Sequence, residues 1–438
     1  MDSFLQALPA LIASRPSELQ LLDGRNQRTP RCTATASWAS TAQGAAFLAQ
    51  DHAAALLRLP GVGDAAASEW LQAVAAYHVG AVRALAAGDA KAAWEQQVRL
   101  VGAMKDLVEL ELARRFLRPR LVQTVYVDLR RVAMLADAEA GGGGMLEGSA
   151  AKFQAGFSAF FRGNKQAALV AVNQLLKLNF AVNQPHLCKA LFGNIERGML
   201  GPDLDPPHGK FLGAQFPASQ RATYFYYCGR YSVYQDEFRE AQKHMHAAAV
   251  LCRAHACAGA QCAAPAAGCA CRQLQRVLAY LVPVNLLMGR MPAPQLLQRH
   301  GLQRFQKLQH SVEYGSLHEF NEAMAENQLA FIKAGLYLAL EKLRSVVMRN
   351  LMKRICGLLV EQGRAGTKGR QFDLENHVLP VVRWLEPDFD LEDLECCVVN
   401  LVHGGYLKGY ISYTTHKLVT AEQAFPAARL KVAPTISF

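Results

Sequence analysis

The 438-residue chain contains no run of apolar residues long enough to cross a membrane, since a spanning helix needs roughly 18 or more in succession. Residues 1–4 carry no basic segment of the kind that begins a secretory signal, and Pro9 and Pro16 interrupt the apolar residues nearby. We therefore expect a soluble intracellular protein with no membrane partner.

The chain also lacks the recurrent motifs of common catalytic sites. It has no P-loop, no GxGxxG turn, no GxSxG elbow and no HExxH pair. His244 and His246 resemble the metal-binding pair of one class of metalloproteases. Eight and eleven residues after His246, however, stand Ala254 and Cys257 instead of the serine and aspartate that those enzymes use. We therefore expect no catalytic residues, no cofactor and no small-molecule substrate.

Cysteine is abundant, with 11 in the chain and five of them between positions 252 and 271. Without a secretory signal we expect thiols rather than disulfides. Alanine and glycine fill the gaps, and the spacings are not those of paired CxxC motifs, so we favour a low-complexity insertion and predict no metal site. The alternative is a structural zinc with ligands drawn from His244, His246, Cys252, His255, Cys257, Cys262, Cys269 and Cys271.

The net charge is +11, from 47 basic and 36 acidic residues. Such an excess favours a polyanionic partner, which can be nucleic acid, an acidic protein or a charged membrane. A merely basic surface is an equally simple interpretation. Charge alone does not choose among these alternatives.

The chain divides by composition into five segments. The first is rich in small and polar residues and has no sustained periodicity, which is typical of a flexible lead-in. Helical periodicity begins near Ala65, and Asp89 is placed to cap a long helix. The glycines at 141–144 break the pattern, because consecutive glycines carry too much backbone entropy for a helix. The predicted segments are 1–63 (lead-in), 64–148 (N-terminal helical region), 149–343 (helical-repeat solenoid), 344–421 (winged helix) and 422–438 (C-terminal tail).

The solenoid segment consists of short amphipathic stretches joined by brief turns. Helix pairs of this kind stack on one another, because one pair cannot bury its apolar face alone. One pair resembles a tetratricopeptide unit, in which small residues let the helices approach and aromatic residues fill the space between them: Tyr227, Gly229, Arg230, Tyr231, Phe238 and Ala241. The predicted helices are 167–182, 187–199, 221–235, 237–251, 273–288, 295–299, 302–310, 317–326 and 330–344.

The last hundred residues change character. They predict helices at 346–361, 374–385 and 391–403, followed by strands at 406–412 and 416–420 that form a β-hairpin. Three helices followed by a hairpin make a winged helix. The predicted fold is therefore mainly α, with a helical-repeat (TPR-like) solenoid followed by a C-terminal winged helix with a small β-hairpin.

Four short motifs narrow this architecture to one family. They are YYCGR at 226–230, YLVPV at 280–284 with GRMP at 289–292, RNL at 349–351 with Lys353, and GYLKGYIS at 405–412. Together they resemble the PCI domain-containing protein two family, the PCI subunit of the transcription-coupled nuclear mRNA export complex. The resemblance runs from about residue 150 to about residue 420, and the chain departs from it at 141–144, 252–272 and 363–370.

The resemblance implies a non-catalytic scaffold with a PCI domain. Its partners would be a large Sac-type export scaffold, a small acidic disordered subunit of the DSS type, and RNA or double-stranded DNA bound at the winged helix. The implied location is nuclear, including the nuclear pore, with a cytoplasmic pool as an addition. The alternative is a purely structural PCI subunit of a signalosome- or proteasome-lid-like complex without nucleic-acid contact.

Basic residues are concentrated at the start of the winged helix, where eight cations between 342 and 370 face one acid, Glu361. The helical period places Arg349 and Lys353 on one face, opposite an apolar face of Leu343, Val347, Leu351, Ile355 and Leu358. The alternatives to phosphate binding are a solvated face or a groove for the acidic subunit. With the lysines of the hairpin, the predicted nucleic-acid-binding residues are Lys342, Arg344, Arg349, Lys353, Arg354, Arg364, Lys368, Arg370, Lys408 and Lys417.

The hairpin carries tyrosines beside its lysines, a combination that suits stacking on bases. We nevertheless expect Tyr406 and Tyr410 to pack onto the helices beneath. The third helix begins with acidic residues, which have the wrong sign for entering a DNA major groove, so we expect backbone binding rather than sequence-specific reading. The predicted partner-binding residues, near the edge strand, are Leu407, Ile411 and Leu418.

Overall fold

The chain forms two compact units, one made of Met1–Pro206 and Lys210–Gln220, the other of Pro207–Gly209 and Arg221–Phe438. The computed structural model describes residues 65–109, 119–142, 144–199, 216–254, 270–366 and 369–426. The predicted lead-in, most of the cysteine-rich stretch and most of the predicted tail lie outside these ranges. None of the described helices is both long and apolar enough to span a membrane.

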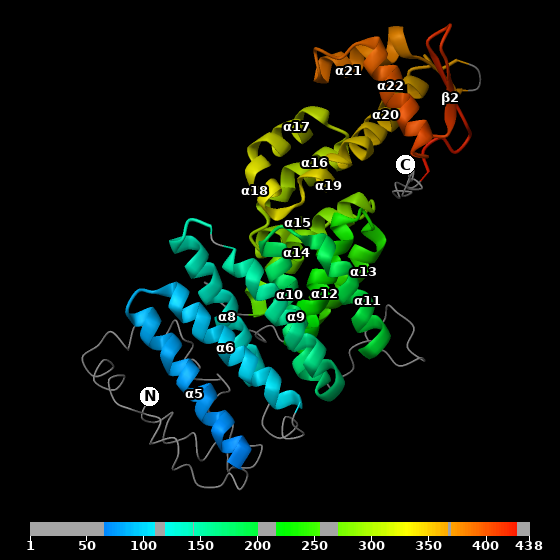
Figure 1. Cartoon of the computed structure of the whole chain (residues 1–438). Coiled ribbons are helices and arrows are strands. Elements are labelled where there is room, and N and C mark those ends of the chain that lie inside the picture. The colour runs from blue at the N-terminus through cyan, green and yellow to red at the C-terminus, as the bar shows by residue number, and fades with distance from the viewer. Residues whose placement is uncertain are drawn as a thin grey trace. The chain divides into compact units, whose positions relative to one another are not determined.

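The first unit consists of successive helices that pack against their neighbours in sequence (Figure 1). The predicted cap at Asp89 is confirmed, because its Oδ1 accepts a hydrogen bond from the backbone N–H of Ala92 at 2.8 Å. The described helices are α5 (Ala65–Ala86), α6 (Ala90–Glu109), α8 (Pro119–Glu139), α9 (Met145–Gly163), α10 (Lys165–Ala181), the 3-10 turn η2 (Pro185–Leu187) and α11 (Cys188–Met199).

The predicted glycine break is a turn between α8 and α9, and both helices belong to the first unit. Gly141 and Gly142 take positive φ values of 67° and 104°, which cost a glycine little. The carboxylate of Asp137 accepts hydrogen bonds from the first two backbone N–H groups of α9, at 2.8 and 2.9 Å. The glycines therefore reverse the chain, and Asp137 ties the two helix ends together. The predicted segment boundaries stay predictions.

The second unit begins with the predicted tetratricopeptide-like pair, α12 (Ala218–Tyr234) and α13 (Phe238–Ala254), followed by α14 (Ala270–Leu287). The close approach expected at Gly229 is confirmed, because a Cβ there would lie 2.8 Å from the side chain of Met245 on α13. Beside it, the Arg230 guanidinium lies 5.2 Å from the centre of the Tyr280 ring on α14. The Tyr280 hydroxyl donates to the carbonyl of Ala334 at 2.6 Å. Motif residues therefore join three layers of the solenoid.

The predicted helix at 330–344 is wrong, because this stretch is divided among three helices. Gly335 ends α18 (Gln328–Ala334) with a left-handed φ of 69°. A short α19 (Tyr337–Glu341) follows, and α20 (Leu343–Glu361) comes after it. The helices that precede them are α15 (Pro294–Arg299), the 3-10 turn η3 (Gln303–Phe305), α16 (Gln306–Tyr314) and α17 (Leu317–Glu326).

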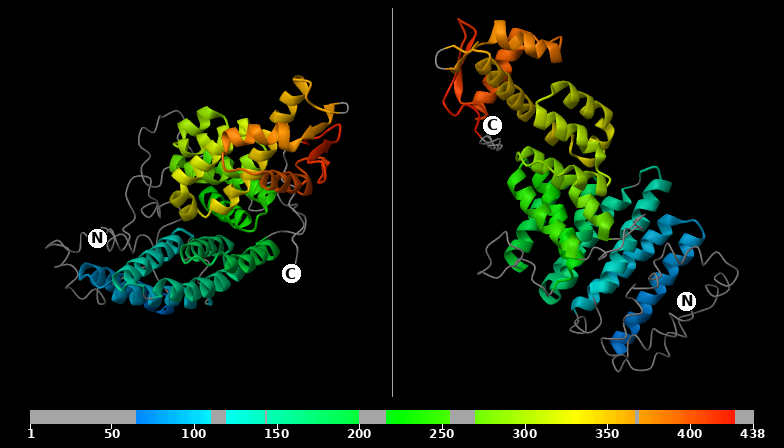
Figure 2. Two further views of the ribbon diagram at one scale, coloured as in Figure 1. Left: turned by 90° about the horizontal axis from the view of Figure 1, so that it is seen from above. Right: turned by 180° about the vertical axis from the view of Figure 1, so that it is seen from behind.

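The winged helix is confirmed and has one more strand than predicted. Its sheet has the order β1-β3-β2, and both pairings are antiparallel. The extra strand, β1, pairs Phe372 with Leu418 and Asp373 with Lys417. The elements are α20, β1 (Gln371–Asp373), the π-helical turn η5 (Leu374–Val378), α21 (Leu379–Leu385), α22 (Leu391–His403), β2 (Gly409–Ser412) and β3 (Lys417–Thr420). Figure 2 shows the module from two further sides.

Candidate nucleic-acid interface on the winged helix

The helix α20 carries four of the ten predicted basic residues and is positioned by α16. Gly315, which ends α16, approaches α20 so closely that a Cβ on it would lie 2.5 Å from the backbone nitrogen of Leu351. The side-chain amide of Asn350 donates to the carbonyl of Val312 at 2.6 Å. A glycine contact and a side-chain hydrogen bond thus fix which face of α20 is exposed.

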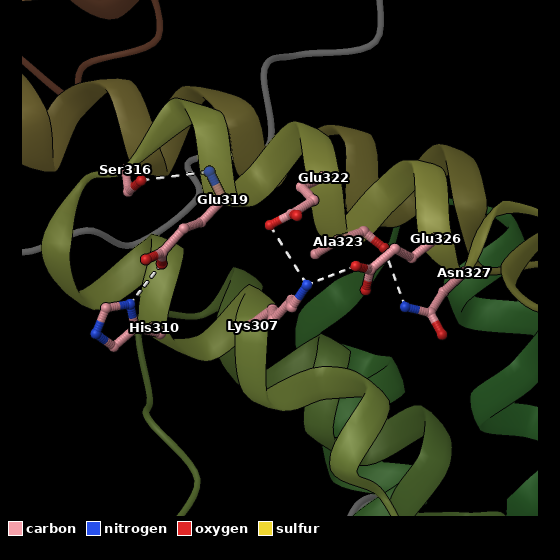
Figure 3. Close-up of polar contacts among 8 residues, drawn as sticks. All are labelled: Lys307, His310, Ser316, Glu319, Glu322, Ala323, Glu326 and Asn327. Atoms are coloured by element: carbon pink, nitrogen blue, oxygen red, sulfur yellow. Dashed lines mark hydrogen bonds and ion pairs between the residues drawn. The ribbon is translucent and has the colours of Figure 1, made fainter. Parts of the chain in front are cut away.

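Ion pairs on the surface hold α16 against α17 (Figure 3). Lys307 pairs with Glu322 at 3.3 Å and also with Glu326, and His310 pairs with Glu319. The hydroxyl of Ser316 caps α17 by accepting from the backbone N–H of Glu319 at 3.3 Å. These exposed pairs contribute little stability each, and Glu319 and Glu322 line one pocket with His310 and Tyr314.

Two cations of α20, Lys353 and Arg354, are exposed. The guanidinium of Arg354 lies 4.7 Å from the centre of the Tyr314 ring, which is itself 44% exposed. Arg344 near the start of α20 and Arg364 beyond its end are exposed too. Within the described part of the chain these four cations form no ion pair with a carboxylate. They are the predicted residues that the structure leaves available to a phosphate.

Arg349 is buried, contrary to the predicted exposed face. Only 7% of it is accessible, and its guanidinium donates to the carbonyls of Phe425 at 3.2 Å and Pro426 at 2.6 Å. The same group lies 5.9 Å from the centre of the Phe425 ring, and burial lowers its pKa. The end of the described chain returns over α20 and covers this position. We therefore remove Arg349 from the phosphate-binding set.

Of the remaining predicted cations that the structure describes, all but Lys408 have partners or partial cover. Lys342 forms an ion pair with Asp236 at 2.6 Å, and Arg370 pairs with Glu422 at 3.2 Å. Lys417 is half-buried, and Lys408 is exposed at the start of the hairpin. Lys368 lies outside the described residues. The predicted basic residues are thus of two kinds, because some form contacts within the chain and others face solvent.

The apolar face of α20 follows the prediction over most of its length. Leu343, Val347, Leu351 and Ile355 are buried, but Leu358 is 52% exposed. In the last turns of α20 the buried stripe passes instead through Met352, Cys356 and Leu359. The buried stripe therefore shifts around the axis of α20 toward its C-terminal end, which leaves Leu358 exposed. The prediction that Leu358 is buried is wrong for this reason.

The hairpin buries two of the three residues predicted to bind a partner. Leu407 is 1% exposed and Leu418 is fully buried, while Ile411 is half-buried. Ile411 stands opposite Leu418 in the antiparallel pair, so both belong to the inner face. Leu407 and Leu418 therefore have no exposed surface for a partner, and we withdraw them.

The two tyrosines of the hairpin differ. Tyr406 is buried as expected, and burial raises its pKa to about 12. Tyr410 stands opposite Val419 on the outer face and is 62% exposed. The expectation that Tyr410 packs onto the helices is therefore wrong, because the two-residue period of a strand turns it outward.

The histidines and cysteines suggested for a zinc site are partly outside the described residues. Of those described, His244 stacks against Phe225 at 6.2 Å, and Cys252 is buried on α13. Among the described residues, no three His, Cys, Asp or Glu side chains are grouped so that they could hold a metal ion. A zinc site would therefore need at least one ligand outside the described residues.

Comparison with known proteins finds relatives of this chain. No family model matches the chain. The chain is 30% identical over 260 residues to PCI domain-containing protein 2 of Danio rerio, covering 59% of this chain and 56% of the relative. It is 31% identical over 263 residues to the homolog from Dictyostelium discoideum, covering 60% and 54%. The CSN12 homolog of Mycosarcoma maydis matches at 27% over 267 residues, covering 59% and 53%.

Over this stretch the chain is similar to members of the PCI domain-containing protein 2 family. The matched stretch spans little more than half the length of these relatives. The mainly helical architecture agrees with a PCI domain, because stacked helix pairs precede a winged helix with a small antiparallel sheet.

Sequence reasoning missed one residue of the candidate interface, Tyr314. It lies 40 positions before Arg354 in the chain, as their numbers show. Its stacking with Arg354 depends on the close packing of α16 and α20 through Gly315. A glycine directly after Tyr314 was the available signal, since helices commonly end in a left-handed glycine. Nothing in the sequence shows which helix that end approaches.

Proposed function

We propose that this chain is a non-catalytic adaptor subunit of a nuclear mRNA export complex that binds RNA through the exposed cations of α20. The observation that carries the proposal is the pair formed by Arg354 and the half-exposed Tyr314, beside exposed Lys353. An arginine on an aromatic ring presents charge to a phosphate and an apolar edge to a base. This combination is typical of surfaces that bind single strands without sequence preference.

The proposed partners follow from the family. They are a large Sac-type export scaffold, a small acidic disordered subunit of the DSS type, and RNA with double-stranded DNA as a second nucleic acid. The proposed location is the nucleus, including the nuclear pore. The family supports these proposals, and the +11 charge of the chain agrees with a polyanionic ligand.

The test uses the partner-bound complex, in which Lys353, Arg354 and Arg364 are all changed to Glu. Each lost phosphate contact on a single strand lowers the log–log salt slope by about 0.7, so three contacts give a slope shallower by about 2. Binding of an unstructured RNA oligonucleotide is followed by fluorescence anisotropy from low to high salt. Affinity should fall for all sequences tested, because phosphate contacts carry no base information.

A matched control changes Lys91, Lys152 and Lys165 to Glu. These three lysines are exposed in the first unit, and their reversal alters the net charge of the chain by the same amount. The control should keep the RNA slope of the unmodified complex. An equal loss in both variants would reduce the effect to net charge and would overturn the assignment to α20.

The alternative is a purely structural PCI subunit of a signalosome- or proteasome-lid-like complex. It is favoured by the cations that already bind within the chain, such as Lys342 with Asp236 and Arg349 with the carbonyl of Pro426. Unchanged RNA affinity and slope in the α20 variant would support it. Affinity purification then separates the two, since an export scaffold and a proteolytic or deneddylating complex are different partners.

A further inference from the structure

The helix α21 presents the most exposed large apolar side chain in the described part of the chain. Trp384 is 84% accessible, and Val381, three residues earlier on the same face, is 37% accessible. Figure 1 shows α21 on the opposite side of α22 from the hairpin. An indole is expensive to leave in water, and tryptophan is among the residues that most often dominate the binding energy of protein interfaces.

The segment that follows Trp384 is held by hydrogen bonds. The Arg383 guanidinium donates through Nε to the carbonyl of Phe389 at 2.9 Å, across the turn that leads to α22. The carboxylate of Glu386 accepts from the side-chain amide of Asn321 on α17 at 3.0 Å. Asp390 and Asp393 form a capping box at the start of α22. Trp384 is therefore presented beside a preorganised turn, which lowers the entropic cost of binding.

The charge beside Trp384 is opposite to that of the chain as a whole. Residues 383–402 contain six carboxylates and one cation, Arg383, in a chain of net charge +11. Four of these carboxylates, on Asp388, Asp390, Glu392 and Asp393, are exposed. The N-terminus of α22 stabilises such charges on its own chain, but their field also extends to a molecule that approaches Trp384.

We propose that Trp384 and Val381 dock a segment of another protein in which an apolar side chain is flanked by lysines or arginines. This proposal rests on the adaptor role proposed above and names the chemistry of one of its partners. The apolar residue would pack on the indole, and the basic residues would face the carboxylates of the turn and of α22. Electrostatic complementarity of this kind mainly selects the partner and speeds its association.

Two other occupants fit this surface poorly. Nucleic acid would bring phosphates against the four exposed carboxylates. A second copy of the chain, related by a two-fold axis, would place the same carboxylates against one another. Like charges that meet across an interface are strongly unfavourable. The surface therefore suits a basic partner rather than RNA or a homodimer.

The experiment selects binders from a random dodecapeptide display library on the full-length protein. Bound peptides are counted by sequencing after selection on the unmodified chain, on Trp384→Ala and on Leu338→Ala. Leu338, on α19, is the matched control because it is 74% exposed and far from the acidic segment in sequence. Both substitutions remove exposed side chains, so neither should change the melting temperature by more than a degree or two, which is measured first.

We expect one class of selected peptides to combine an aromatic or aliphatic residue with neighbouring lysines or arginines. Synthetic members of that class should bind Trp384→Ala at least about 30-fold more weakly, as for a typical hot-spot residue, and should bind Leu338→Ala normally. Changing Asp388, Glu392 and Asp393 to Asn, Gln and Asn should weaken them further and flatten their salt dependence. Selected peptides that are acidic, or that bind Trp384→Ala unchanged, would overturn the proposal. Neither result depends on RNA, so the proposed RNA binding by α20 is tested independently of this proposal.

Discussion

The two ends of the winged helix carry opposite charge. The α20 end exposes Arg344, Lys353 and Arg354, whereas residues 384–402 contain six carboxylates and no basic residue. Both sets of charged residues lie within one small module, so the net charge of the chain does not show where either set lies. The comparison shows that a fold can separate two electrostatic surfaces that the composition averages together, and that each surface must be assigned its own kind of partner.

The two ends also differ in how the fold holds them. The acidic end is organised mainly by local contacts, the capping box and Arg383 across a turn of a few residues, with long-range contacts added from Asn321 to Glu386 and from His416 to Glu395. The basic end depends on contacts between segments far apart in the chain, namely Gly315 with Leu351 and Arg349 with Phe425. Substitutions at these distant contacts should therefore affect the basic end more than the acidic one.

The largest effect is expected for Gly315→Ala. Gly315 has a φ of 72°, and a Cβ on it would meet the backbone nitrogen of Leu351 at 2.5 Å. The left-handed conformation costs a non-glycine residue about 1–2 kcal/mol, and overlap with a helix backbone adds about 1–3 kcal/mol. The free energy of unfolding, measured by urea titration of the full chain, should fall by about 3 kcal/mol.

Gly335→Ala is the matched control for this substitution. Gly335 has a similar φ of 69°, but its Cβ would meet nothing within 4 Å. It should lose only the conformational part, about 1 kcal/mol. Equal losses at the two glycines would show that the approach of α16 to α20 is not what positions the basic end.

Arg349→Gln should have the next largest effect. The substitution removes the guanidinium that satisfies the carbonyls of Phe425 and Pro426 and leaves buried polar groups without their partner. Each unsatisfied buried group costs about 1–3 kcal/mol, so we expect a loss of about 2 kcal/mol in the free energy of unfolding. Lys353→Gln, four residues along the same helix, should change it by less than about 0.5 kcal/mol because Lys353 is exposed.

RNA binding by the same two variants should show the reverse order. The salt slope of the complex should fall by about 0.7 for Lys353→Gln and remain unchanged for Arg349→Gln. A changed slope for Arg349→Gln, with unfolding unaffected, would return Arg349 to the phosphate-binding set. This pair of measurements separates the structural cation of α20 from the exposed ones.

The sequence predicted the helices of the winged helix well because its signals are local. Asp390 caps α22, and the end predicted for that helix, residue 403, is the observed one. The sequence pattern did not predict β1, which is three residues long and is formed only by pairing with β3. Periodicity also placed Arg349 with Lys353 on one face of α20. It could not show that Phe425 and Pro426 return to cover one of them.

Local sequence patterns were equally unable to predict which residues of the partner-binding surface are exposed. Apolar residues in the hairpin predicted an exposed edge, but pairing puts Leu418 and Ile411 on the inner face of the sheet. The exposed apolar residue, Trp384, belongs to a helix whose pattern is compatible with burial. The sequence could reveal only that basic residues are missing from 384–402. Which side chains remain accessible depends on tertiary packing, and no local pattern records it.

The smallest effect is expected at the contact between the hairpin and the acidic helix. His416 lies in the hairpin turn, and its Nδ1 is 2.8 Å from the carboxylate of Glu395 on α22, whose side chain is only 10% exposed. The hydrogen bond with Glu395 raises the pKa of His416 above 6.5, and the nearby carboxylates of Glu375 and Asp373 act in the same direction. A histidine whose pKa is raised by folding binds its proton more tightly in the folded state. Its contribution to stability is therefore complete below pH 6.5 and is lost as the pH rises through the higher folded value.

His416→Asn removes this contribution and suits the backbone, because His416 has a φ of 49° and asparagine tolerates the left-handed region. The free energy of unfolding of the two proteins should differ most in mildly acidic buffer and least well above neutral pH. Urea titrations at a series of pH values give the difference between them, in which carboxylates common to both largely cancel. A difference that does not vary with pH, or that grows as the pH rises, would contradict a protonated His416 joining the hairpin to α22. In that case His416 would not hold a proton against Glu395 in the folded protein.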